Sequence, residues 1–243
     1  MTIDIRSGVE TQITDDPWPD GTVAWAPGGN RLAFASLRAG MWTGIVRDAS
    51  WGGREQQIGT CGNIDAWFPD GAHVACERAA ERGMALWKLS VDGRDAPVPI
   101  VDELSPTAQA RVSPDGRWLA YSTDHATQQR EIRVVGLTRG ASPRVVSLGP
   151  GTTPHWRQDA RELFFLSGRR LIAIPVEART GTPFGRPTPL FDAPLPPRDS
   201  LADFQAQFAV SRDGSRFLFA IPPEGGPRLA IHVVPDWIAA PSR

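Results

Sequence analysis

The sequence lacks an excess of charge of either sign. Its 243 residues include 26 Lys and Arg and 27 Asp and Glu, which gives a formal net charge of -1. A nucleic-acid-binding domain usually shows a basic surplus, and an anionic membrane surface attracts clustered Lys and Arg. The charge balance therefore argues against both as partners. The even mixture of signs also differs from a disordered acidic or basic tail.

Long apolar runs and cysteine clusters are also missing. No stretch approaches the run of about 18 apolar residues that a membrane-spanning helix needs. The first residues show no basic segment followed by an apolar one, so no signal peptide is predicted. The two cysteines, Cys61 and Cys76, have neither CxxC nor zinc-ligand spacing. Because free cysteines are commonly buried, we expect two unpaired, small apolar residues.

Glycine and proline, by contrast, are abundant and are spread along the whole chain, with Gly 24 and Pro 23. Both exceed their average usage of about 7% and 5%. This distribution indicates many short elements joined by tight turns. A chain of this length suits a single all-β domain and can bury a sizeable core.

One motif recurs five times: an apolar residue, a short polar turn and a strand-like run. The fourth residue of each copy is, in order, Gly28, Asp70, Asp115, Asp159 and Asp213. The spacings between them are 42, 45, 44 and 54 residues. A period in the low forties with strand-like runs is typical of a four-stranded β-propeller blade. We therefore predict an all-β fold in which residues 1–243 form one β-propeller domain.

The copies place blade motifs near 23–36, 64–77, 108–122, 152–166 and 206–221. We expect residues 1–14 to supply outer strands that close the ring, because a propeller combines strands from both termini to leave no bare edge. Two architectures stay open: five blades, or six blades with an incomplete first blade. The longest interval is rich in proline, which predicts an exposed loop insertion over Ala193–Ala202.

The repeated turns are interpreted as structural. An Asp carboxylate bonds local backbone amides, and Gly tolerates a positive φ. Because the carboxylates occupy equivalent positions of a repeat, turn stabilisation explains them better than acid or base catalysis. The residues concerned are Asp70, Gly71, Asp115, Gly116, Asp159, Asp213 and Gly214.

No catalytic, cofactor-binding or metal-binding residue is predicted. The sequence contains no GxSxG, HExxH, P-loop or protein-kinase motif. Three of the histidines are interpreted as packed strand residues, and the other, His125, as part of a solvated loop. The three are His73, His155 and His232.

Tryptophan is frequent and falls into two groups. Trp25, Trp67 and Trp156 share one position of the motif and are interpreted as core residues between blades. The segment around residues 42–54 instead combines aromatic and Arg side chains, which are typical of interaction hot spots. We predict partner-binding residues there, for a protein, peptide or small-molecule ligand of unknown identity: Trp42, Arg47, Trp51 and Arg54.

Several segments carry a family resemblance: Thr11–Pro17, the Pro-Asp-Gly-type turns, Pro154–Phe165, Pro187–Phe191, Val210–Leu218 and Ile231–Trp237. Across its whole length the chain resembles TolB-like, WD-repeat-like propellers. More specifically, it resembles the C-terminal propeller of bacterial receptor-like serine/threonine protein kinases, although it contains neither a kinase domain nor a spanning helix.

The resemblance implies a non-catalytic binding or sensor module without a cofactor and an extracytoplasmic location. Two alternatives stay open. One is a periplasmic TolB-like scaffold protein, and the other is a propeller enzyme with a site in the central channel.

Overall fold

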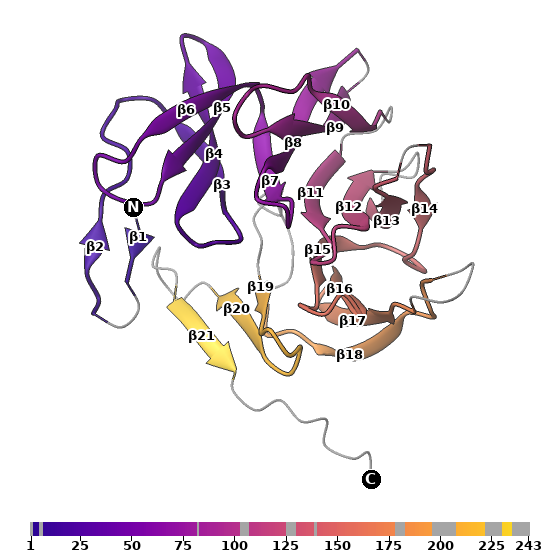
Figure 1. The fold of residues 1–243 in the computed structure, drawn as a ribbon. Helices are drawn as coiled ribbons and strands as arrows, with labels where there is room; N and C mark the ends of the chain where they lie inside the picture. The colour runs from indigo at the N-terminus through magenta and orange to yellow at the C-terminus, as the bar shows by residue number, and fades with distance from the viewer. Residues whose placement is uncertain are drawn as a thin grey trace. The chain divides into compact units, whose positions relative to one another are not determined.

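The computed structural model describes residues 2–4, 7–81, 83–102, 107–124, 130–138, 140–177, 183–195, 208–221 and 230–234. Within these ranges the regular structure is β-strand, and no helix long and apolar enough to cross a membrane is found. The chain divides into two compact units, Met1–Thr107 and Ala108–Arg243. Each unit consists of antiparallel sheets whose strands follow one another along the chain (Figure 1).

The first unit contains two four-stranded sheets and one short two-stranded pair. The pair consists of β1 (Thr2–Ile3) and β2 (Glu10–Thr11). The first four-stranded sheet consists of β3 (Asp20–Trp25), β4 (Arg31–Arg38), β5 (Met41–Asp48) and β6 (Glu55–Thr60). The second consists of β7 (Asn63–Trp67), β8 (His73–Ala80), β9 (Gly83–Ser90) and β10 (Val98–Val101). In both, each strand pairs with the next one in sequence.

The second unit repeats this arrangement. One sheet consists of β11 (Thr107–Val112), β12 (Trp118–Asp124), β13 (Arg130–Gly136) and β14 (Arg144–Val145). The next consists of β15 (Thr152–Trp156), β16 (Glu162–Ser167), β17 (Arg170–Pro175) and β18 (Thr188–Asp192). The last has three strands among the described residues, β19 (Phe208–Val210), β20 (Phe217–Ile221) and β21 (Ala230–Val234).

The predicted blade motifs coincide with the first two strands of the five larger sheets, except for residues 206 and 207, which lie outside the described residues. The all-β prediction is thus confirmed. Strands β1 and β2 pair with each other, Thr2 opposite Thr11. The closing role of residues 1–14, the number of blades and the single-domain organisation stay predictions.

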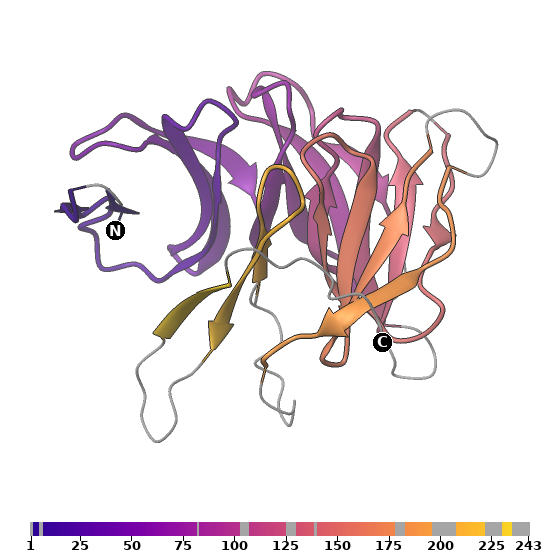
Figure 2. The same cartoon turned by 90° about the horizontal axis from the view of Figure 1, so that it is seen from below.

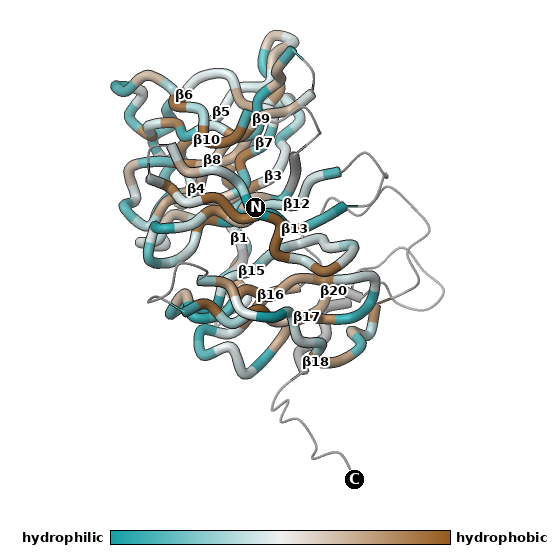
Figure 3. The backbone as a smooth tube through the Cα atoms, turned by 90° about the vertical axis from the view of Figure 1, so that its right-hand side faces the viewer, coloured by the Kyte–Doolittle hydropathy of each residue, from teal (hydrophilic) through white to brown (hydrophobic). Residues whose placement is uncertain are grey.

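The same hydrogen-bonded turn joins the first two strands of all five sheets. In each, the turn glycine or its equivalent donates its amide to a carbonyl three residues earlier, at 2.8–3.0 Å. Gly71, Gly116 and Gly214 have φ values of 64°, 69° and 75°, as their predicted role requires. Ala160 holds the equivalent place at a φ of 59°, where a side chain is disfavoured. Figure 3 shows that apolar stretches lie within strands such as β16 and β17.

Apolar side chains fill the space between neighbouring sheets within each unit. In the first unit, Trp67 is buried and its Nε1 donates to the carbonyl of Ala24, 3.0 Å away. In the second, Trp156 makes the equivalent bond to the carbonyl of Arg111, at 2.9 Å. Figure 2 shows the sheets β11–β14 and β15–β18 side by side. The inter-sheet role predicted for these two tryptophans therefore has a repeated geometric basis. The same prediction for Trp25 is wrong, because its side chain is 52% exposed.

The two cysteines form a disulfide, so the expectation of unpaired residues is wrong. Their Cα atoms are 5.9 Å apart, and both side chains are fully buried. Cys61 lies in the connection between β6 and β7, and Cys76 lies in β8 opposite Ile64 of β7. The β7–β8 register therefore brings together two residues that are 15 positions apart in sequence.

A second correction concerns the predicted exposed insertion over 193–202. Ala193 and Leu195 are buried, at 0% and 3% exposure, in the cluster that contains Phe208 and Phe219. The chain after β18 therefore returns to the apolar core before it reaches residues 196–202, which lie outside the described residues. Proline content indicated the absence of regular structure there, but it did not indicate exposure.

Candidate functional site

The predicted turn carboxylates bond their own turns. Oδ1 of each accepts a backbone amide two residues onward, at 2.8 Å for Asp70 and at 3.0–3.1 Å for the other three. The Arg157 guanidinium lowers the pKa of Asp159 to about 2. Hydrogen bonds from Ser211 and Ser215 hold the pKa of Asp213 well below its usual range. These groups are therefore ionised at neutral pH, and their oxygens are engaged locally.

The four predicted partner-binding residues do not form one patch. Trp51 is 62% exposed in the turn between β5 and β6, and Arg54 is exposed beside it. Trp42 lies at the opposite end of β5, where a carbon of its ring is 3.5 Å from the point that a Cβ on Gly21 would occupy. Arg47 is half-buried and pairs with Glu55 at 3.2 Å. Only Trp51 and Arg54 are thus placed together, and their role in binding stays a prediction.

The histidines occupy separate places. Nδ1 of His73 lies 2.8 Å from Asp70 Oδ2. Burial and the charge of Arg111 lower the pKa of His155 to about 3, and its ring packs on Phe208 with centroids 4.4 Å apart. His125 lies outside the described residues. Among the residues that are described, no group of three or more His, Cys, Asp or Glu is placed to hold a metal ion.

A groove in the second unit gathers a different set of side chains, which sequence reasoning did not identify. Its floor is the indole of Trp118, the first residue of β12, which pairs with Gly136 of β13. A Cβ on Gly136 would lie 3.5 Å from the indole and 3.2 Å from Ala141 Cβ. The indole therefore lies close beside Gly136, as aromatic side chains do beside sheet glycines.

The opposite wall comes from the chain that follows β17. Val176 and Phe184 form an isolated antiparallel bridge, and the amide of Glu177 donates to the carbonyl of Pro183 at 2.7 Å. Phe184 packs edge-on against Trp118, with ring centroids 5.1 Å apart and an interplanar angle of 75°. The favourable geometry of this aromatic pair fixes the indole from one side and leaves the groove open on another.

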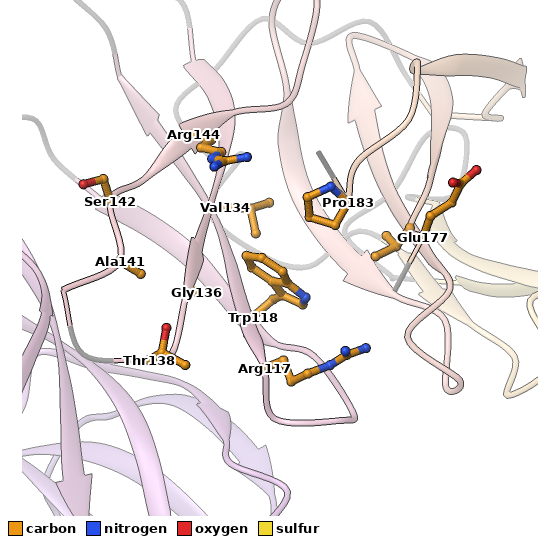
Figure 4. A pocket seen from close by; sticks show the side chains of 11 residues that line it. Arg117, Trp118, Val134, Gly136, Thr138, Ala141, Ser142, Arg144, Glu177 and Pro183 are labelled. Atoms are coloured by element: carbon orange, nitrogen blue, oxygen red, sulfur yellow. The ribbon is translucent and has the colours of Figure 1, made fainter. Parts of the chain in front are cut away.

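The groove has a volume of about 300 Å³, the lower end of the range for ligand sites. Figure 4 shows Trp118 at its centre, Pro183 across from it, and the guanidinium groups of Arg117 and Arg144 on either side of the indole. The lining residues are Arg117, Trp118, Val134, Gly136, Thr138, Ala141, Ser142, Arg144, Val176, Glu177 and Pro183. All belong to the second unit.

The charges of the groove are held differently at its two sides. Arg117 donates from Nε to Asp115 Oδ2 at 2.6 Å, while neither of its Nη atoms has a partner among the described residues. The turn carboxylate thus fixes the guanidinium and leaves its outer nitrogens available. Glu177 is exposed, and its carboxylate likewise has no partner in the described part of the chain. The groove therefore offers a cation and an anion around an aromatic floor.

A signal for this groove was present in the repeat. The residues equivalent to Trp118 in the other copies, whose carbonyls accept the same turn hydrogen bond, are Arg31, His73, Glu162 and Arg216. Trp118 is only half-buried and is the largest of the five. An indole at a position that otherwise holds a polar or charged side chain indicates a local role, but the Gly136 and Phe184 contacts were not foreseeable from spacing.

No family model matches the sequence, and no curated protein matches it. Solved structures do match. TolB from Acinetobacter baumannii has a TM-score of 0.67 at 16% identity, covering 89% of this chain and 51% of that chain. Oligogalacturonate lyase in complex with manganese has 0.67 at 13%, covering 96% and 70%. The Cps50 (Swd1) β-propeller domain from Myceliophteria thermophila has 0.60 at 14%, covering 90% and 71%.

At these identities the likeness shows the fold alone. Together with the repeated four-stranded sheets, it establishes an all-β propeller, as predicted from the sequence. The chain spans about half (51%) of the Acinetobacter TolB structure and 64% of the putative TolB from Agrobacterium tumefaciens. The propellers that it resembles include an enzyme, the lyase, beside TolB and the Cps50 domain.

Proposed function

We propose that this propeller is a non-catalytic binding module and that the groove around Trp118 is its ligand-binding site. The observation that carries the proposal is the half-buried indole held between Gly136 and Phe184, with the Nη atoms of Arg117 beside it. Aromatic and Arg side chains are enriched at binding hot spots because they combine large contact area with directed polar groups. The repeat supplies a rigid scaffold on which such a site can be built.

The proposal extends to origin and location. The resemblance of the sequence to propellers of receptor-like serine/threonine kinases supports derivation from the extracytoplasmic part of such a kinase. The buried Cys61–Cys76 disulfide supports a compartment outside the reducing cytoplasm, because disulfides form and persist mainly in oxidising environments. A TolB-like scaffold role is the second candidate, and the likeness to TolB over 89% of this chain favours it.

The test is a fragment screen observed by NMR. Anionic, cationic and neutral fragments are added to ¹⁵N-labelled protein, and the backbone amide signals of Gly136 and Thr138 report on the groove. We expect saturable shifts of these signals in the wild type and none in Trp118→Leu. The indole lines an open groove and is only half-buried, so this variant is expected to fold.

A matched control separates the groove from general tryptophan effects. Trp18→Leu makes the same change at a residue that is 45% exposed and lies outside the groove, and it should leave the shifts unchanged. The proposal fails if no fragment shifts Gly136 and Thr138, or if the responding signals gather around Trp51 instead. Stoichiometric zinc or calcium in the purified protein would favour the enzyme alternative.

A further inference from the structure

We infer that the occupant of the groove is a peptide segment in which a carboxylate side chain lies next to an apolar one. The inference rests on the proposed function, since it names the ligand class of the same site. It follows from three features of the groove: an apolar seat, the outward-facing guanidinium of Arg117 and a single opposing carboxylate.

The apolar seat has room for one side chain. Trp118 forms its base, Val134 and Val176 flank it, and Pro183 lies opposite. A side chain placed here leaves water for an environment of ring and methyl groups, a gain of about 25 cal/mol per Å² of apolar surface. Gly136 also lines the groove and adds no side chain to the seat.

The guanidinium groups define the polar partner. Asp115 holds Nε of Arg117, so the side chain keeps one orientation and its two Nη atoms face outward. Arg144 is exposed at the other side of the indole. The planar guanidinium of Arg117, with its two available nitrogens, fits a carboxylate through two parallel hydrogen bonds. A carboxylate beside an apolar group would thus meet both parts of the groove at once.

The remaining carboxylate discriminates among anions. Glu177 lines the same groove and has no ion-pair partner among the described residues. A polyanion such as an acidic oligosaccharide would bring further negative charges against it, and like charges at short distance disfavour binding. A peptide carries one carboxylate among neutral amides, whose backbone groups suit the hydroxyls of Thr138 and Ser142. Charge complementarity therefore favours the peptide.

The probe is a set of acetylated, amidated tetrapeptides in which the two central positions run through all pairs of amino acids. Each is titrated while the Gly136 and Thr138 amide signals are followed. We expect the tightest pairs to combine Asp or Glu with Leu, Ile, Phe or Pro. Replacing the acidic residue by its amide should weaken binding about tenfold, the loss expected for one charge-assisted hydrogen bond.

Variants of the protein test the assigned contacts. Arg117→Gln should weaken the acidic peptides about tenfold and leave the amide analogues unchanged. Arg94→Gln is the matched control, because Arg94 also has its Nε near an aspartate two residues earlier, Asp92 at 3.4 Å, but lies in the first unit. It should not change affinity.

Three outcomes overturn the inference. Neutral pairs that bind as tightly as acidic ones would remove the role of the guanidinium groups. Trigalacturonate binding more tightly than every peptide would make the ligand an acidic sugar. Fragments that shift Gly136 while no peptide does would refute the peptide class and leave the proposed function standing. If neither fragments nor peptides shift it, both proposals fail.

Discussion

Reducing the Cys61–Cys76 disulfide is expected to lower the unfolding free energy of the first unit by about 3 kcal/mol. The bridge closes a segment of 15 residues between the β6–β7 connection and β8. In the chain-entropy model, a loop of this length restricts the unfolded chain by about that amount at 25 °C. Both side chains are fully buried, so the bond also joins the core shared by the first two sheets.

The assay is urea unfolding with and without a phosphine reductant, followed by hydrogen exchange and mass spectrometry. For a urea dependence of about 1–3 kcal/mol per molar, the loss corresponds to a midpoint lower by about 1–3 M. Peptides from residues 61–90 should lose protection, and peptides from the second unit serve as the internal control. The Cys61→Ala/Cys76→Ala double variant should reproduce the reduced protein, with an additional loss from the space left by the sulfur atoms.

Two results would refute this reasoning. One is an identical urea midpoint for the oxidised and the reduced protein. The other is the detection of two free thiols in protein purified without reductant, because the bridge would then not form. Exchange that accelerates equally in peptides of both units would show that the effect is not confined to the segment that the bridge closes.

Two further predictions concern charged groups. Asp115→Ala should lower the unfolding free energy by about 0.5–2 kcal/mol, because the Arg117 amide loses its acceptor. Asp115→Asn should lower it less. An alanine variant as stable as the wild type would contradict the turn role. The pKa of His155 falls from 6.5 to about 3 on folding, so the unfolded chain takes up the proton first as the pH drops. Stability should be complete above pH 6.5 and lower by about 2 kcal/mol at pH 5 in urea titrations. His155→Gln should remove this slope, and an unchanged slope would exclude His155.

The pH range in which His155 affects stability does not overlap with the range in which the turn carboxylates do. The pKa of Asp159 is lowered to about 2, so its contribution to stability is present above about pH 4 and is lost as the pH falls toward 2. Changes in the unfolding free energy between pH 6.5 and 5 therefore report on His155. Changes below pH 4 report on the turn carboxylates.

The sequence allowed the strands to be predicted because the repeat acts locally. A turn such as Ser113–Gly116 needs only neighbouring residues to form its bonds, so its spacing along the chain locates the strands on either side. The disulfide was not predictable, since it depends on which residues of β7 and β8 lie opposite each other. The burial of Leu195 was missed for the same reason: it depends on Phe208 and Phe219, which come later in the chain.

The groove shows where a repeat is informative about function. A residue that all copies share satisfies a requirement that all blades share, and the turn carboxylates with their identical backbone bonds are of this kind. Trp118 departs from the polar or charged residues that the other copies hold at its position, and its indole lies beside Gly136 and packs edge-on with Phe184. This aromatic contact is not needed for stacking sheets, because Leu119, the residue equivalent to Leu32 and Leu163, already meets that need in the same blade. The physical consequence of Trp118 with its two neighbours is an open aromatic surface beside the fixed guanidinium of Arg117, which is what a ligand requires and a packed core does not.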